Sequence, residues 1–228
     1  MSNKISFECL ELTSDKGVIH AKFSNPPLNT AAVLMVGGGD GGFDGPASAI
    51  YPSLAENLYG KGVAALLLDY RIHSFPGNLE EAIHDVLVGI DHLLKMGIDN
   101  IGLVGHSFGG AVVIEAAVRE PMISSIISLA SQTAGALNVK QISPRPILFV
   151  HGLDDIRLPP DCSRYLHSIA EEPKELVLFE GATHSLRQCR EDLLILLLEW
   201  FEKKLISVSY THLRAHETRH DLVCRLLL

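Results

Sequence analysis

Short apolar runs alternate along the chain with longer segments in which apolar residues recur every three or four positions. Continuous apolar runs are typical of buried strands, and they lie near residues 31–36, 63–68, 100–104, 123–129, 146–150 and 175–179. The helical spacing occurs near residues 47–60, 79–96, 108–119, 160–171 and 187–204. Residues 5–12 and 18–23 predict an opening hairpin, because turn-forming residues lie between them at 14–17.

This alternation of strands and helices predicts one α/β domain, with a mostly parallel sheet covered by helices on both faces. The chain has 228 residues, of which 47% are hydrophobic and 20% are charged, so it can bury one sizeable core. The connection over residues 132–145 joins two of the predicted strands and has room for a short helix at most. We therefore expect no sizeable cap domain.

Ser107 lies in a turn that has a glycine two residues before it and another two residues after it. The strand near 100–104 runs into the sequence GHSFG at residues 105–109, and a helical segment follows at once. A strand, a Gly-x-Ser-x-Gly turn and a helix form a nucleophile elbow, in which small neighbours allow a turn tight enough to expose the serine hydroxyl. Ser107 is therefore a candidate nucleophile. The less favoured alternative is an ordinary strand-to-helix turn with an incidental serine.

Such an elbow predicts an acid and then a histidine, each just after a later strand. The strand near 146–150 is followed by Asp154 and Asp155, and the strand near 175–179 is followed by His184. We expect Asp155 to be the acid, although the spacing leaves Asp154 open and either could be a turn or helix-cap residue. A single loop histidine is usually a solvated side chain, but His184 completes the order serine, acid, histidine that the elbow predicts.

These residue types indicate acyl transfer. A serine hydroxyl needs a base to take its proton, and His184 would be that base, with Asp155 orienting its imidazole. The oxyanion of the tetrahedral intermediate needs two donors. We expect the backbone N–H of Phe108 to be one. The other should come from the glycine loop after the strand at 31–36, with Gly39 preferred and Gly38 or Asp40 as alternatives.

The sequences GHSFGG, HGLDDIRLP and GATH at these three places resemble those of the α/β-hydrolase superfamily. The resemblance extends from about residue 31 to residue 205 and is greatest to small, lidless esterases and to dienelactone-hydrolase-like members. Dienelactone hydrolases proper have a cysteine where this chain has Ser107. The resemblance implies an α/β-hydrolase fold and a serine hydrolase that cleaves carboxylic esters, thioesters or lactones through an acyl-enzyme. No metal or organic cofactor is implied.

Two other functions remain open. Residues 37–42 match the Gly-x-Gly-x-x-Gly dinucleotide fingerprint, and Asp69 could bind a ribose, which would make the chain a nucleotide-binding protein. In that fingerprint the helix opens at the glycines, whereas residues 43–46 intervene here before the helical segment. The second is a hydrolase fold that serves only as a binding scaffold.

The formal net charge of −8 disfavours nucleic acid and anionic membranes as partners. The expected partner is the small acyl substrate that the candidate residues and the resemblance imply. Outside residues 207–228 the cysteines are Cys9, Cys162 and Cys189, an odd number without a close pair. This favours free thiols in a reducing compartment. With no apolar leader and no run long enough to span a bilayer, we expect a cytoplasmic protein. The sequence leaves its oligomeric state open.

The end of the chain breaks the pattern. Residues 208–218 and 222–228 can each be read as translated adapter DNA from sequencing libraries, in one reading frame. We therefore expect a hydrolase domain over residues 1–206 and a non-native tail over residues 207–228, excluded from the fold. If the tail is non-native, its histidines and Cys224 are not a metal site. The alternative is a native basic tail.

Overall fold

The computed structural model describes residues 5–27, 29, 31–74 and 77–206. Within them, one sheet has the strand order β1-β2-β4-β3-β5-β6-β7-β8. Strand β2 runs antiparallel to both of its neighbours, and every other adjacent pair is parallel. The strands are β1 (Glu8–Ser14), β2 (Gly17–Ser24), β3 (Ala31–Val36), β4 (Val63–Asp69), β5 (Ile101–His106), β6 (Ile123–Leu129), β7 (Ile147–Gly152) and β8 (Lys174–Phe179).

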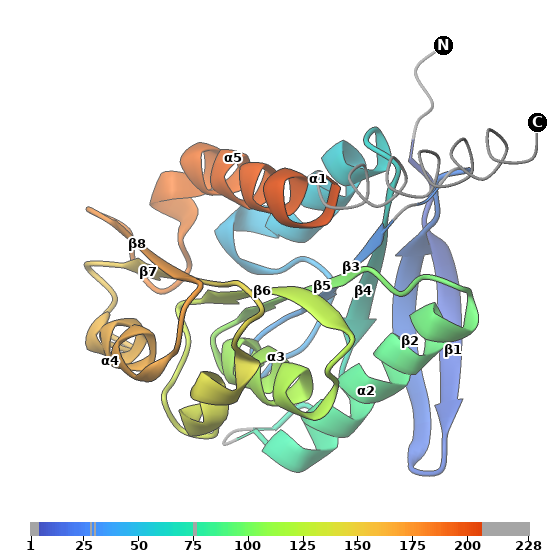
Figure 1. Cartoon of the computed structure of the whole chain (residues 1–228), viewed down its shortest axis with the longest axis horizontal. Coiled ribbons are helices and arrows are strands. Elements are labelled where there is room, and N and C mark those ends of the chain that lie inside the picture. Colours follow the sequence, from blue (N-terminus) through green and yellow to red (C-terminus); the bar gives the residue numbers. More distant parts are fainter. Residues whose placement is uncertain (1–4, 28, 30, 75–76, 207–228) are drawn as a thin grey trace, which may run out of the picture.

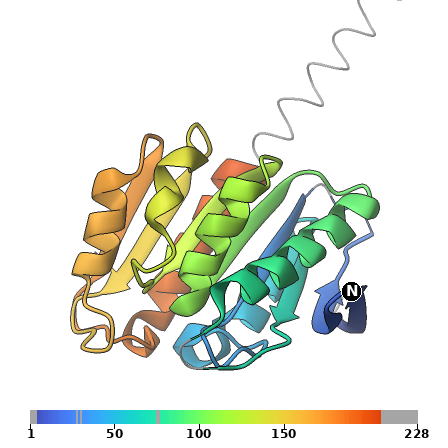
Figure 2. The same cartoon turned by 90° about the horizontal axis from the view of Figure 1, so that it is seen from below.

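Helices cover both faces of this sheet (Figure 1). Helices α1 (Pro46–Tyr59) and α5 (Arg190–Phe201) pack on one face, around a core that includes Leu54 and Leu197. Helices α2 (Leu79–Lys95), α3 (Phe108–Arg119) and α4 (Asp161–Ile169) lie side by side on the other (Figure 2). Because the central strands are covered twice, β3 is buried at every residue, which explains its unbroken apolar run. The fold class expected from the sequence is confirmed.

Several boundaries differ from the expected ones. The first strand begins at Glu8 and not at residue 5, and it runs on to Ser14. The last helix was expected from residue 187, but a 3₁₀ turn, η2 (Arg187–Cys189), precedes α5. The α-helix then ends at Phe201, and a π-helical turn, η3 (Glu202–Ile206), follows.

The start of α1 differs most from the expected regular helix. Residues 47–49 have φ angles of 52°, 55° and 65°, in the left-handed region, so regular α-helix begins only after them. Left-handed backbone is unfavourable for residues with a Cβ atom, so it needs an outside cause. One is visible in the loop that carries the candidate histidine, where the carbonyl of Ser185 accepts the N–H of Ala47 at 2.7 Å.

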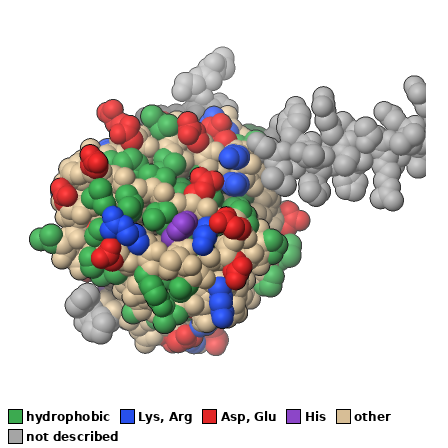
Figure 3. Space-filling model, turned by 60° about the vertical axis from the view of Figure 1, so that its left-hand side comes forward, with side chains coloured by type: hydrophobic (Ala, Val, Ile, Leu, Met, Phe, Trp, Pro, Cys, Tyr) green, Lys and Arg blue, Asp and Glu red, His purple; other side chains and the backbone are tan. Residues whose placement is uncertain are grey.

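The parallel strands all end at one edge of the sheet, and the loops after β3, β5, β7 and β8 lie there together. Between β6 and β7 the chain forms only the short 3₁₀ helix η1 (Leu137–Ile142). In the part of the chain that the structure describes, no helix is both long and apolar enough to cross a membrane. On the face drawn in Figure 3, acidic and basic side chains are interspersed among hydrophobic ones. The expected tail at 207–228 lies outside the described residues.

Candidate active site

Ser107 lies at the turn between β5 and α3, with φ 58° and ψ −119°. The turn is tight: a Cβ atom on Gly105 would overlap the carbonyl of Gly109, so no larger residue fits at position 105. The backbone N–H of Ser107 donates to Leu129 at the end of β6 over 2.8 Å, which ties the turn to the neighbouring strand. A non-glycine residue in this conformation is strained, and such strain gathers at functional sites.

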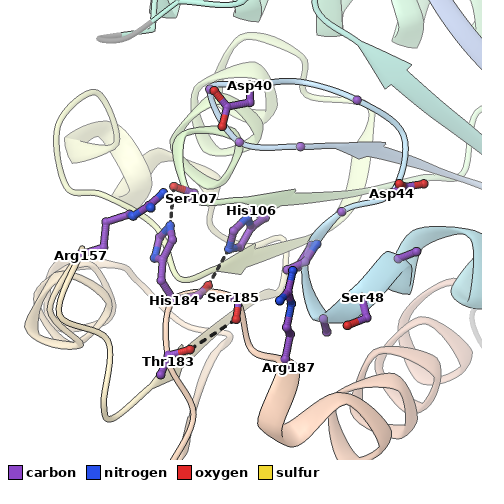
Figure 4. A pocket seen from close by; sticks show the side chains of 18 of the residues that line it. Asp40, Asp44, Ser48, His106, Ser107, Arg157, Thr183, His184, Ser185 and Arg187 are labelled. Carbon is purple, nitrogen blue, oxygen red and sulfur yellow. Dashed lines mark hydrogen bonds between the residues drawn. The ribbon is translucent and has the colours of Figure 1, made fainter.

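A line of hydrogen bonds leads from this serine through His184 to a buried carboxylate, and Figure 4 shows its first bond, between Ser107 and His184. His184 Nε2 lies 2.9 Å from Ser107 Oγ, and His184 Nδ1 lies 2.7 Å from Asp155 Oδ2. The side chain of Asp155 is fully buried, whereas Asp154 is exposed. Because an ionised carboxylate only accepts, Nδ1 carries the imidazole proton and Nε2 can accept from the hydroxyl.

The environment of Asp155 favours its ionised form. Burial alone would raise the pKa of this carboxyl, but the backbone N–H of Leu158 and the imidazole of His184 bring it below its usual value. The Oδ1 atom accepts the N–H groups of Arg157 at 2.9 Å and Leu158 at 3.0 Å. An ionised, well-held carboxylate is what stabilises a neighbouring imidazolium.

A second histidine supports the loop of the first. His106 Nε2 donates to the carbonyl oxygen of His184 at 2.9 Å, and the two rings lie 4.9 Å apart. Burial lowers the pKa of His106 to about 4, so it is neutral at physiological pH. His106 therefore stabilises the backbone of His184 without adding a second positive charge to the site.

The two segments expected to supply the oxyanion donors are the start of α3 and the glycine loop after β3. Phe108 is the first residue of α3, where backbone N–H groups have no acceptor within the helix. In the glycine loop, a Cβ atom on Gly38 would lie 3.5 Å from Ser107 Cβ, whereas one on Gly39 would meet only the carbonyl of Ser74 within 4 Å. Gly38 is thus the closer of the two to the serine, and Gly39 and Asp40 line the same pocket.

The pocket around Ser107 has a volume of about 1150 Å³ and is formed by residues 37–49, 106–107, 155–157, 183–185 and 187. It includes Arg157 and Arg187, which the sequence analysis did not single out. Figure 4 shows these two side chains reaching toward the site from different sides. Their closeness along the chain to Asp155 and His184 was the available signal. No group of His, Cys, Asp or Glu side chains suited to a metal occurs among the described residues.

Other residues considered from the sequence have structural contacts. Asp69 Oδ1 accepts the N–H of Gly42 at 2.6 Å and faces His73 Nε2 at 2.8 Å, so the carboxylate proposed for a ribose holds the glycine loop. Arg71 forms ion pairs with Glu81 at 2.7 Å and Asp85 at 2.5 Å, away from the pocket. These contacts hold the loop after β4 and leave neither Arg71 nor Asp69 directed at a ligand.

Comparison with known proteins gives matches in sequence and in fold. The family model described as "Dienelactone hydrolase family" matches residues 47–218. The uncharacterized protein YfhR of Escherichia coli K12 is 24% identical over 213 residues, covering 80% of this chain and 73% of its own. Its namesake in Salmonella typhi is 27% identical over 205 residues, covering 73% and 68%.

Solved structures share the architecture. Est1E from Butyrivibrio proteoclasticus, in a structure with ferulic acid bound, has a TM-score of 0.74 at 19% identity, over 86% of this chain and 99% of that one. The dienelactone hydrolase from Anabaena variabilis has a TM-score of 0.73 at 18% identity, over 89% of this chain and 100% of that one. At such identities the likeness concerns the fold.

Proposed function

Because the chain belongs to the dienelactone hydrolase family and is thereby a hydrolase, we propose that it cleaves carboxylic esters, thioesters or lactones by a serine mechanism. The observation that carries this proposal is the hydrogen-bonded line from Ser107 through His184 to Asp155, at the edge of an open pocket. A nucleophile, a base and an orienting acid in sequence are the groups that acyl transfer needs.

In the proposed reaction, Ser107 Oγ attacks the substrate carbonyl while His184 Nε2 takes the hydroxyl proton. The oxyanion is stabilised by the N–H of Phe108 and by an N–H of the glycine loop at Gly38 or Gly39. The tetrahedral intermediate collapses, and His184 returns the proton to the leaving oxygen or sulfur. Water then attacks the acyl-enzyme with His184 again as base, which releases the acid and restores Ser107.

The pocket bears on which substrates fit. Its volume of about 1150 Å³ is large enough for an aromatic acyl group, and Est1E, a structural neighbour, has been solved with ferulic acid bound. Arg157 and Arg187 at its wall favour groups that carry oxygen acceptors. We therefore propose aromatic and short acyl esters as the first substrates to examine.

An active-site-directed fluorophosphonate tests the proposal, together with a panel of esters, thioesters and lactones that differ in acyl group and leaving group. The probe should label Ser107, and Ser107→Ala should abolish both labelling and turnover. Ser48→Ala is the matched control, because Ser48 lines the same pocket outside the hydrogen-bonded line, and it should retain both. Folded protein that is neither labelled nor active would favour the scaffold function, and tight binding of a dinucleotide would favour the nucleotide function.

A further inference from the structure

A second buried histidine contacts the same carboxylate oxygen of the proposed triad as His184 does. His151 lies near the end of β7, and its side chain is fully buried, as is that of Asp155. Its Nε2 atom lies 3.1 Å from Asp155 Oδ2 and 2.9 Å from the carbonyl oxygen of Leu158. Its Nδ1 atom lies 2.7 Å from Ser163 Oγ in α4, a hydroxyl that is also buried.

These partners determine where the proton of His151 resides. A carbonyl oxygen can only accept, so Nε2 must carry a hydrogen to satisfy Leu158. Burial lowers the pKa of His151, against the raising effects of Leu158 and Asp155, so the ring is neutral and has one N–H. Nδ1 then accepts from the hydroxyl of Ser163. The titratable groups that act on the ring are Asp155, His184 and His106.

With this proton assigned, Asp155 accepts four hydrogen bonds. Two backbone N–H groups occupy Oδ1, and Oδ2 accepts the N–H of His184 and also the N–H of His151, which is shared between Oδ2 and the carbonyl of Leu158. A carboxylate held at both oxygens cannot rotate without losing a buried hydrogen bond, which is costly. The N–H of His151 also withdraws electron density from the oxygen that faces His184, which weakens the attraction between that oxygen and an imidazolium.

We propose that His151 is a positioning residue for the hydrolase, which holds Asp155 Oδ2 against His184 and tempers the basicity of the proposed catalytic imidazole. This proposal rests on the proposed function. It extends the line of hydrogen bonds to five groups, from Ser163 through His151, Asp155 and His184 to Ser107. Only the last of these would touch the reacting carbonyl.

The test compares two replacements of His151. His151→Leu removes the N–H, so the negative charge on Oδ2 acts on His184 alone and should hold the protonated imidazole more strongly. The acidic limb of the pH profile of kcat/KM should move upward by about half to one pH unit, and kcat should fall about tenfold as the carboxylate loses its second anchor. His151→Gln can still donate from its amide, and it should restore the limb to its original pH.

A matched control separates positioning from packing. Ser163→Ala removes the hydrogen bond at Nδ1 of His151 but leaves the N–H between His151 and Asp155, since Leu158 still requires it. This variant should lose stability without moving the acidic limb. A limb that stays in place in His151→Leu, or that moves equally in Ser163→Ala, would overturn the proposal and leave His151 a packing residue.

Nuclear magnetic resonance keeps the test independent of turnover and of variants that fail to fold. In the wild-type protein labelled with ¹⁵N-histidine, His151 should show the Nε2–H tautomer and be neutral from about pH 7 to 8. An Nδ1–H tautomer or a protonated His151 in this range would refute the proposal. Because the same spectra report the titration of His184 in each variant, absence of esterase activity would refute the proposed function alone.

Discussion

Asp155→Asn is the substitution that probes the candidate site most directly, because an amide cannot reproduce the four hydrogen bonds that the carboxylate accepts. One of the two amide atoms is an NH₂ group, and it must face either the backbone N–H groups of Arg157 and Leu158 or the ring N–H groups of His184 and His151. Either orientation sets donors against donors.

Each orientation of the amide has an energetic cost that follows from the contacts it breaks. With NH₂ toward the backbone, two partly buried N–H groups lose their acceptor, at about 1 kcal/mol each. With NH₂ toward His184, the imidazole satisfies it only as the Nε2–H tautomer, which cannot accept the proton of Ser107. The negative charge that stabilises the imidazolium is lost in both cases. We expect kcat to fall about 10³- to 10⁴-fold, which corresponds to about 4–5.5 kcal/mol in the barrier.

The assay measures kcat and KM for the best ester of the panel, with fluorophosphonate labelling to count intact sites and circular dichroism to confirm folding. KM should change little, because Asp155 lies behind His184 and not against the substrate. Asp154→Asn is the neighbouring control: its side chain is exposed, and its backbone N–H, which donates to Ala182 at 2.9 Å, is unaltered. It should keep activity within about threefold.

A folded Asp155→Asn variant with nearly wild-type kcat would refute this reasoning. So would a larger loss in Asp154→Asn than in Asp155→Asn, which would move the orienting role to the neighbouring residue. A loss confined to KM would indicate that the carboxylate acts on substrate binding and not on the imidazole.

Three further predictions concern stability. Gly105→Ala should destabilise the fold by about 3 kcal/mol or more in urea denaturation, because its Cβ would overlap Gly109, whereas Gly60→Ala, with its nearest atom at 3.5 Å, should be nearly neutral. Burial lowers the pKa of His106 from 6.5 to about 4, so between these pH values the unfolded chain binds more protons than the folded one. The melting temperature should therefore fall as the pH falls from 6.5 to about 4, and it should fall less steeply in His106→Gln. Deletion of residues 208–228 should leave activity and melting temperature nearly unchanged, and a loss of several kilocalories would refute an inert tail.

The fold could be predicted largely from the sequence, because strands of a parallel sheet that is covered on both faces appear as continuous apolar runs. Strand β3 is buried at all six residues and is apolar at all six, so no alternating pattern obscures it. The glycines of the elbow are equally informative, since position 105 has no room for a side chain. Such local constraints can be recognised without knowing what packs against them.

Features set by distant contacts could not be predicted in this way. Residues 47–49 have an ordinary helical composition, and their left-handed backbone depends on contacts such as that with Ser185, far along the chain. The sequence favoured Gly39 over Gly38 and Asp40, but the path of the glycine loop past Ser107 brings Gly38 closer to the serine than Gly39. His151 likewise resembles a packing residue until α4 brings Ser163 to its ring.

The position of His184 follows from the same kind of contact, since its loop has no regular structure of its own. The carbonyl of Ala182 accepts from Asp154 in the acid turn, that of His184 from His106 beside the nucleophile, and that of Ser185 from Ala47 in the left-handed turn. Groups at the ends of three different strands, β7, β5 and β3, thus hold one backbone segment through its carbonyl oxygens. Because backbone groups make most of these contacts, the geometry around His184 depends on where the loops run more than on which side chains they carry. Substitutions that move the start of α1 should therefore alter the base as well as the wall of the pocket.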